Sequence, residues 1–398
     1  MQAQRSIHTP QPSGRAKEPR PRGGAPLVSV CMPSFNHAAF LPTAIESVLK
    51  QTYPYVQLII VDDGSTDKSL EIAQGYASRY PERVQVFTHE GNAHRGVSAT
   101  ANLAFQRSSG GYWCGLSSDD AFVRDKVERQ VTFLAEHPEI GLVYGPATVI
   151  DADGRRVGLT FARDLSREPD PLRSLLEGNY LHPRTVMVRR DCLEKVGLRD
   201  ESLEYDDWEL WIRIAAHYKI AFLPGPVAYY RIHPTSTAIG QPPEFHRDRN
   251  LEVMQALEAK TFKVGGALVN PFNRAMIKLN LAYLYFCAAD LNRAAEAMKA
   301  AIAIDPAVLL EYRFLAGWLI RRQREVALFT RSEARDYIGW FTAHASVYAP
   351  TDMRRTGALD AIWRLKFALL LGKYGFVSRQ WLRRGELLLE TLRAKWRR

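Results

Sequence analysis

Two adjacent carboxylates, Asp119 and Asp120, follow an apolar run at residues 112–116 (YWCGL) that is typical of a buried strand. Negative charge at such a place is costly unless a cation or a hydrogen-bond donor compensates it. A second acidic segment, residues 61–67 (VDDGSTD), ends another apolar run. Carboxylate oxygens are ligands for Mg²⁺ or Mn²⁺ and acceptors for a nucleotide base. The two segments together predict a site that holds a metal and a nucleotide.

A third acidic pair, Asp206 and Asp207, stands before Trp208 and a helical apolar pattern at residues 209–217. Adjacent carboxylates raise each other's proton affinity, which suits a general base that works near neutral pH. A second interpretation is a charge pair that the dipole of a helix N-terminus favours. The two interpretations are compatible.

Alternating strand and helix patterns surround these acidic segments. We expect strands at 27–32, 56–61, 84–87 and 112–116, with helices at 40–50, 67–78 and 97–107. This alternation predicts an α/β fold with a mostly parallel, doubly wound sheet. Ligands bind such sheets at the carboxyl ends of the strands, where both acidic loops fall.

The pattern divides the chain into three parts. Residues 1–25 form a basic tail that is rich in Pro and Gly and is predicted to be disordered. The α/β domain extends over 26–240, and its second half contains a helix at 126–137, a strand at 141–144 and a hairpin turn at 151–154. Two prolines at 242–243 interrupt the chain, and residues 241–398 are predicted to form an α-helical domain.

One segment of the helical domain, about 275–308, carries the small, aromatic and proline positions of a single tetratricopeptide-like repeat. These positions are Leu281, Ala282, Tyr285, Ala294, Met298, Ala301 and Pro306. One repeat cannot bury its own faces, so neighbouring helices must cover it. Two interpretations stay open: a helical hairpin without a binding role, and a groove for a protein partner.

Composition and charge narrow the class of protein. The 398 residues carry a formal net charge of +10, much of it near the two ends, and four cysteines form no CxxC pair. We expect a reducing, cytoplasmic location, since no apolar run reaches the roughly 18 residues of a membrane span and no signal peptide is evident. The basic amphipathic segment 363–396 fits either peripheral contact with an anionic membrane at its inner face or core packing. No nucleic-acid motif is present, so nucleic acid is not an expected partner.

Seven segments in order resemble family 2 glycosyltransferases. They are VSVCMPSFN (28–36), IESVLKQT (45–52), IVDDGSTD (60–67), GVSATAN (96–102), SDD (118–120), DDWELW (206–211) and YRIHP (230–234). The resemblance implies the GT-A nucleotide-diphospho-sugar transferase fold. It also implies transfer of a sugar from a nucleotide-diphosphate donor with inversion at the anomeric carbon.

The resemblance assigns nucleotide contacts. Pro33, Phe35 and Asn36 would form the floor under the base, and Asp63 would accept a hydrogen bond from the base edge. Arg95 matches a residue of the third wall, where a cation contacts the base or a phosphate. A plain surface arginine is the other interpretation of Arg95.

The resemblance also assigns the metal. Asp119 matches the main carboxylate ligand of Mn²⁺ or Mg²⁺, and Asp120 is either supporting or directed to the ribose. The family usually has a further Asp where this chain has Ser117, so metal affinity is expected to be weaker. His233 would complete the metal site or contact the diphosphate, although a structural histidine is the commoner role of such a residue.

For catalysis, Asp207 matches the general base of the family and Asp206 the neighbour that orients it. The sequence thus predicts a metal-assisted inverting glycosyltransferase with a glycan or lipid-linked acceptor, in cell-surface polysaccharide or glycan assembly. The alternative is a weakly active or inactive nucleotide-sugar-binding scaffold that acts through its helical domain.

Overall fold

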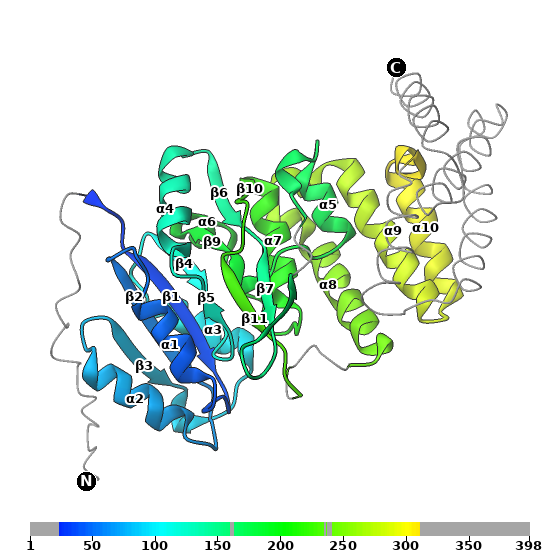
Figure 1. Cartoon of the computed structure of the whole chain (residues 1–398). Coiled ribbons are helices and arrows are strands. Elements are labelled where there is room, and N and C mark those ends of the chain that lie inside the picture. Colours follow the sequence, from blue (N-terminus) through cyan, green and yellow to red (C-terminus); the bar gives the residue numbers. More distant parts are fainter. Residues whose placement is uncertain (1–23, 160–162, 235, 237–240, 311–398) are drawn as a thin grey trace, which may run out of the picture. The chain divides into compact units, whose positions relative to one another are not determined.

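The computed structural model describes residues 24–159, 163–234, 236 and 241–310 (Figure 1). The chain divides into two compact units. The first consists of Met1–Arg163, Leu181–Glu201 and Lys219–Ile232, and the second of Asp164–Tyr180, Ser202–Tyr218 and His233–Arg398. The predicted tail and the basic amphipathic segment 363–396 lie outside the described residues, except for the last two residues of the tail.

A seven-stranded sheet forms the centre of the first unit, in the order β10-β6-β9-β4-β1-β2-β3. Strands β1, β2, β3 and β4 pair in parallel, as do β6 and β10, whereas β9 runs antiparallel to both of its neighbours. The predicted α/β, mostly parallel sheet is therefore confirmed, with one antiparallel strand that makes it mixed. The bounds are β1 (Val28–Ser34), β2 (Val56–Asp62), β3 (Val84–Thr88), β4 (Tyr112–Gly115), β6 (Ile140–Tyr144), β9 (Met187–Arg189) and β10 (Lys219–Phe222).

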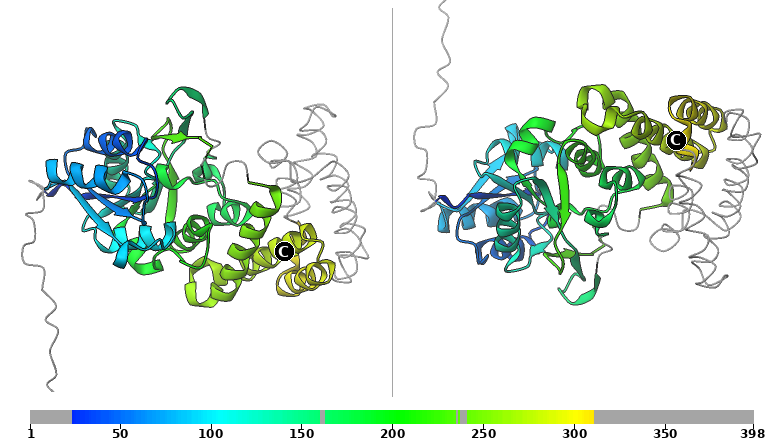
Figure 2. Two further views of the ribbon diagram at one scale, coloured as in Figure 1. Left: turned by 90° about the horizontal axis from the view of Figure 1, so that it is seen from below. Right: turned by 90° about the horizontal axis from the view of Figure 1, so that it is seen from above.

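Helices cover both faces of this sheet (Figure 2). Helix α1 (Leu41–Leu49) packs on β2 and on α2 (Ser69–Arg79), while α3 (Val97–Gln106) packs on β1 and β2. The buried positions of α1 recur at helical spacing, which gives the helix one apolar face. Two more helices belong to this unit, α4 (Lys126–Glu136) and α6 (Arg190–Val196).

A second, smaller sheet belongs to the same unit. Its order is β5-β11-β7-β8, and β7 and β8 form the hairpin expected around residues 151–154. The strands are β5 (Ala121–Phe122), β7 (Ala147–Ile150), β8 (Arg156–Leu159) and β11 (Ala228–Arg231). The sequence did not predict β5, β9, β10 or β11, because runs of two to four residues are too short to show an alternating pattern.

The second unit is helical. Its helices are α5 (Pro171–Glu177), α7 (Asp206–His217), α8 (Pro243–Val264), α9 (Pro271–Cys287) and α10 (Leu291–Ile304). Helices α9 and α10 pack together where the hairpin was expected, and their character as a tetratricopeptide-like repeat stays a prediction. Helices α5 and α7, which precede residue 240, pack on α9 and α8 respectively, so the compact units do not follow a single linear boundary at 240.

Short 3₁₀ turns join these elements: η2 (Glu90–Asn92), η3 (Leu165–Arg167), η4 (Pro183–Thr185), η5 (Gly266–Val269) and η6 (Pro306–Leu310). Within the part of the chain that the structure describes, no helix is long and apolar enough to span a membrane.

Candidate active site

The loops that follow β1, β2 and β4 meet at one edge of the main sheet. Because these strands are parallel neighbours, their carboxyl ends lie together, and Ser34 is in register with Asp62. The Asp63 N–H donates to the Ser34 carbonyl at 2.8 Å, and the Leu116 N–H donates to the Cys31 carbonyl at 3.0 Å. The first two acidic segments predicted from the sequence therefore share one edge.

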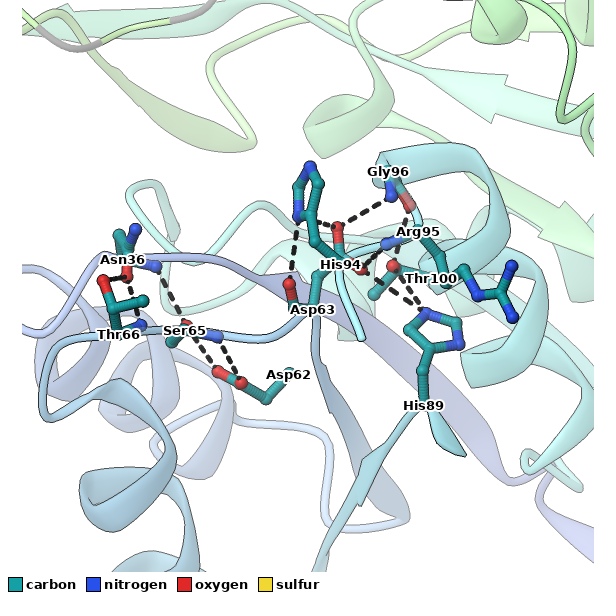
Figure 3. A network of polar contacts seen from close by, with 10 residues as sticks. All are labelled: Asn36, Asp62, Asp63, Ser65, Thr66, His89, His94, Arg95, Gly96 and Thr100. Carbon is teal, nitrogen blue, oxygen red and sulfur yellow. Dashed lines mark hydrogen bonds and ion pairs between the residues drawn. The ribbon is translucent and has the colours of Figure 1, made fainter. Parts of the chain in front are cut away.

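Asn36 joins the loop after β1 to the loop after β2, and Asp62 holds the second loop from within (Figure 3). Asn36 has a positive φ of 51°, a conformation that asparagine tolerates, and its Oδ1 accepts the Thr66 N–H at 2.8 Å. The fully buried Asp62 accepts both the N–H and the hydroxyl of Ser65, at 2.9 and 2.6 Å. Asn36 and Asp62 thus hold the loop backbone in place.

Asp63 is buried and anchors the start of α3. Its two carboxylate oxygens accept the backbone N–H groups of Arg95 and Gly96 at 2.7 and 2.9 Å (Figure 3). His94 Nδ1 lies 3.0 Å from Asp63 Oδ2, and His89 Nε2 lies 3.6 Å from Oδ1. The structure brings Arg95 to Asp63 through its backbone, and the residue as a whole is exposed.

An exposed aromatic pair stands next to Asp63. The rings of Phe35 and His94 lie 4.4 Å apart between centroids at a tilt of 41°, and Phe35 is 40% exposed. Pro33 is partly buried at the end of β1. The sequence suggested Phe35 but not His94, since only the fold places residue 94 beside residue 35.

Asp120 is buried among protein partners. Its Oδ1 accepts the Arg231 N–H at 2.8 Å, and its Oδ2 forms an ion pair with Arg184 Nε. The Arg184 guanidinium lies 4.0 Å from the ring centroid of Tyr230. Burial raises the pKa of Asp120 to about 7, and the Arg184 charge acts against that rise. The choice between a supporting role and a ribose contact for Asp120 stays a prediction.

Arg231 also holds the main chain of the Asp119–Asp120 loop. Its Nε donates to the Asp119 carbonyl at 2.9 Å, and its Nη1 donates to the carbonyls of Asp151 and Ala152 at 3.1 and 3.0 Å. Arg184 was not predicted from the sequence, and Arg231 was noted only as part of the YRIHP segment, without a role. Their contacts could not be predicted, because their partners lie far away along the chain.

Three side chains of the described residues offer a metal-binding arrangement: His37, Asp119 and His233. Each supplies one ligand atom, and these atoms all lie within 4.8 Å of one another. His233 directly follows Ile232, whose N–H donates to the Ile150 carbonyl at 2.9 Å. Two imidazoles and one carboxylate are donors that a divalent cation can take. His37 was not predicted from the sequence.

Asp206 and Asp207 begin α7 in the second unit, so the structure does not group them with the sheet-edge residues. Asp206 is buried, and Asp207 is partly exposed. Asp207 Oδ2 accepts from Asn179 Nδ2 at 3.2 Å, and Trp208 Nε1 donates to the Leu175 carbonyl at 2.8 Å. These bonds hold the start of α7 near α5, and the catalytic roles of the acidic pair remain predictions.

Comparison with known proteins identifies the family. Residues 29–197 match the model of glycosyl transferase family 2. An uncharacterized glycosyltransferase of Haemophilus influenzae is 31% identical over 198 residues, which cover 50% of this chain and 75% of that protein. A putative teichuronic acid biosynthesis glycosyltransferase, TuaG of Bacillus subtilis, is 40% identical over 111 residues, covering 28% of this chain and 43% of TuaG.

A solved structure shows the same fold. The crystal structure of S. aureus TarS 1–349 in complex with UDP-GlcNAc superimposes with a TM-score of 0.55 and 18% identity, covering 83% of this chain and 92% of that one. The likeness to TarS shows a GT-A-like fold, and the family model with the relative from Haemophilus influenzae shows that the chain belongs to glycosyl transferase family 2.

Proposed function

We propose that this protein transfers a sugar from a nucleoside-diphosphate donor to a glycan or lipid-linked acceptor with inversion of the anomeric carbon. The observation that carries the proposal is the shared sheet edge at which Asp63 follows β2 and Asp119 follows β4, the two strands that pair in parallel with β1 on its two sides. In open α/β sheets this edge is where ligands bind.

Asp63 and the aromatic pair of Phe35 and His94 would hold the nucleoside. A carboxylate has about four lone-pair positions, so Asp63 can accept from a base edge in addition to the two backbone N–H groups it already accepts. The exposed ring of Phe35 offers a face for the base. Arg95, Asn36 and Pro33 complete the loops around this position.

Asp119 and His233, which belong to the cluster of possible ligands at this edge, would hold a divalent cation, Mn²⁺ or Mg²⁺. When bound, this ion supplies Lewis-acid stabilisation of the charge that develops on the leaving diphosphate. Asp120, paired with Arg184, supports the loop that presents Asp119.

Asp207 would take the proton of the acceptor hydroxyl as its oxygen attacks the anomeric carbon. The new C–O bond forms while the bond to the nucleoside diphosphate breaks, and the electron pair leaves with the diphosphate. Asp206, buried next to Asp207, would orient it.

The test is a screen of nucleoside-diphosphate sugars with Mn²⁺, followed by an Asp207→Asn variant. We expect one donor to raise the melting temperature by mass action and to be hydrolysed or transferred by the wild type. Asp207→Asn should keep the thermal shift and lose turnover by at least about 100-fold, in the range expected for a general base. The matched control is Asp191→Asn, which removes a first-turn carboxylate from α6 and should retain turnover.

Two outcomes would contradict the proposal. If no nucleotide or donor shifts the melting temperature, the sheet edge is not a nucleotide site. If a donor binds tightly but no acceptor or water receives the sugar, the chain is a nucleotide-sugar-binding scaffold.

The proposal includes a role in cell-surface polysaccharide or glycan assembly and a cytoplasmic location at the inner face of the membrane. The name of the relative TuaG, which refers to teichuronic acid biosynthesis, supports the first part. The basic amphipathic sequence at 363–396 supports the second. A protein partner at the α9–α10 hairpin belongs to the same proposal.

Liposome co-sedimentation tests the membrane part. The full chain should bind vesicles that contain anionic lipid, and deletion of the residues after 360 should release it. Equal binding of both forms, or none by the full chain, contradicts this part of the proposal.

A further inference from the structure

His37 lies beside the acidic loop of β4, although it belongs to the loop after β1. Its Nδ1 is 2.8 Å from Ser118 Oγ, and Ser118 directly precedes Asp119. A ligand nitrogen of His37 and a carboxylate oxygen of Asp119 lie within 4.8 Å of each other. Two loops at one sheet edge therefore bring an imidazole to the carboxylate that is the expected metal ligand.

The backbone of His37 is held independently of its ring. The His37 N–H donates to Ser69 Oγ at 2.9 Å, and the neighbouring Ala38 N–H donates to Asp67 Oδ2 at 2.9 Å. Ser118, which contacts the ring, is almost fully buried. A buried hydroxyl that bonds one ring nitrogen fixes the orientation of an imidazole.

The acidic loop itself is short of charged ligands. Ser117 stands where a further carboxylate would serve, and Asp120 is committed to Arg184 and to the Arg231 N–H. Among residues 117–120, Asp119 is the carboxylate that belongs to the cluster with the two imidazoles. A cation held here would therefore draw its remaining protein ligands from outside this loop.

We propose that His37 is a metal ligand that takes the place of the missing carboxylate at residue 117, with Ser118 as the residue that positions its ring. The inference deepens the proposed function and rests on it. Because an imidazole nitrogen replaces a carboxylate oxygen, the site should select Mn²⁺ over Mg²⁺.

The experiment measures binding of Mn²⁺ by electron paramagnetic resonance, with MnCl₂ alone and with MnCl₂ plus UDP, and competition by MgCl₂. Loss of a residue that only hydrogen-bonds a metal ligand weakens metal affinity by roughly 10-fold or more. Ser118→Ala should therefore weaken Mn²⁺ binding by about 10-fold, and His37→Ala, which removes a ligand itself, should weaken it further. His37→Asp, which returns a carboxylate, should regain Mn²⁺ binding and narrow the preference for Mn²⁺ over Mg²⁺. The control is His137→Ala, since His137 lies 3.6 Å from Glu139 at the surface and should not affect Mn²⁺.

The outcomes separate the two proposals. Unchanged Mn²⁺ affinity in a folded His37→Ala variant, or no Mn²⁺ binding by the wild type in either condition, overturns the inference. Mn²⁺ binding that depends on His37, without sugar transfer to any acceptor or water, overturns the proposed function and leaves the inference standing. Thermal melts of each variant confirm that the protein is folded.

Discussion

At the scale of single residues, both carboxylate oxygens of the buried Asp120 have protein partners, Arg184 on one and the Arg231 N–H on the other. The position and acidity of Asp120 followed from an apolar run that ends in two carboxylates. The sequence did not predict Arg184 as its partner, because Arg184 is 64 positions away and comes close only when the chain after β7 returns to the sheet. His37 and His94 were not predicted for the same reason, since the residues that they contact, Ser118 and Phe35, belong to other loops.

Breaking this buried pair should be costly. Asp120→Asn leaves the Arg184 charge enclosed without its counter-charge, which should lower the free energy of unfolding by about 3 kcal/mol. The double variant Asp120→Asn/Arg184→Gln should recover part of that loss. Urea unfolding measures both, with Asp153→Asn as control, because the exposed pair of Asp153 and Arg155 should contribute less than about 1 kcal/mol. If the double variant lost as much free energy of unfolding as the two single variants together, the two side chains would not be coupled.

A second residue-scale prediction concerns His182. Burial, with a smaller effect of Arg184, lowers its pKa from 6.5 to about 3. Between pH 6.5 and 3 His182 therefore binds a proton in the unfolded chain but not in the folded chain. Its contribution to the free energy of unfolding falls as the pH falls through this window and is constant above it. The wild type should lose free energy of unfolding between about pH 7.5 and about pH 5, and His182→Gln should make this loss smaller by about 1–2 kcal/mol. Urea unfolding at the two pH values measures this, and an equal loss in wild type and variant would contradict it.

At the scale of elements, long apolar runs made the sequence informative. Strands β1, β2, β3, β4 and β6 lie within two residues of the expected bounds, because each carries consecutive buried or partly buried side chains. The way the loops interlock was not predictable, since it depends on close approach of backbones. Gly64 is an example: its φ is +78°, and a Cβ there would lie 2.7 Å from the Asn92 carbonyl oxygen.

Gly64→Ala should therefore disturb the edge that carries Asp63. A methyl group in the left-handed region, pressed against a carbonyl, should cost more than the about 1 kcal/mol typical of alanine at a positive φ. It should also reduce the thermal shift given by UDP. Gly91→Ala is the matched control, because Gly91 has a φ of +65° and a Cβ added there would meet no atom within 4 Å. Equal melting temperatures for the two variants would contradict the steric argument.

At the scale of the whole molecule, the sequence predicted an α/β part and a helical part with a single boundary at residue 240. The structure interleaves the two along the chain, and α5 and α7 pack on helices that follow residue 240. Periodicity along a sequence gives the type of each element but not the partner that buries its apolar face. The general base expected at Asp207 thus begins a helix of the second unit.

Truncation tests this organisation. A chain ending at residue 240 lacks α8, α9 and α10 and should expose the apolar sides of α5 and α7. We expect it to associate on gel filtration and to shift tryptophan emission to longer wavelength, since Trp208 and Trp211 are buried in the whole chain. A monomeric truncated chain with unshifted emission would show that residues 26–240 form an independent domain.

The order in which the chain enters the two units has a consequence for its synthesis. The polypeptide passes between the units at residues 163, 180, 201, 218 and 232. During translation, α5 and α7 leave the ribosome before the last strands of the first unit and well before α8 and α9, on which they pack. Neither unit can complete its core until a stretch belonging to the other has been made. Nascent chains stalled shortly after residue 232 would therefore carry unburied helix faces, and these would be natural clients for a ribosome-associated chaperone.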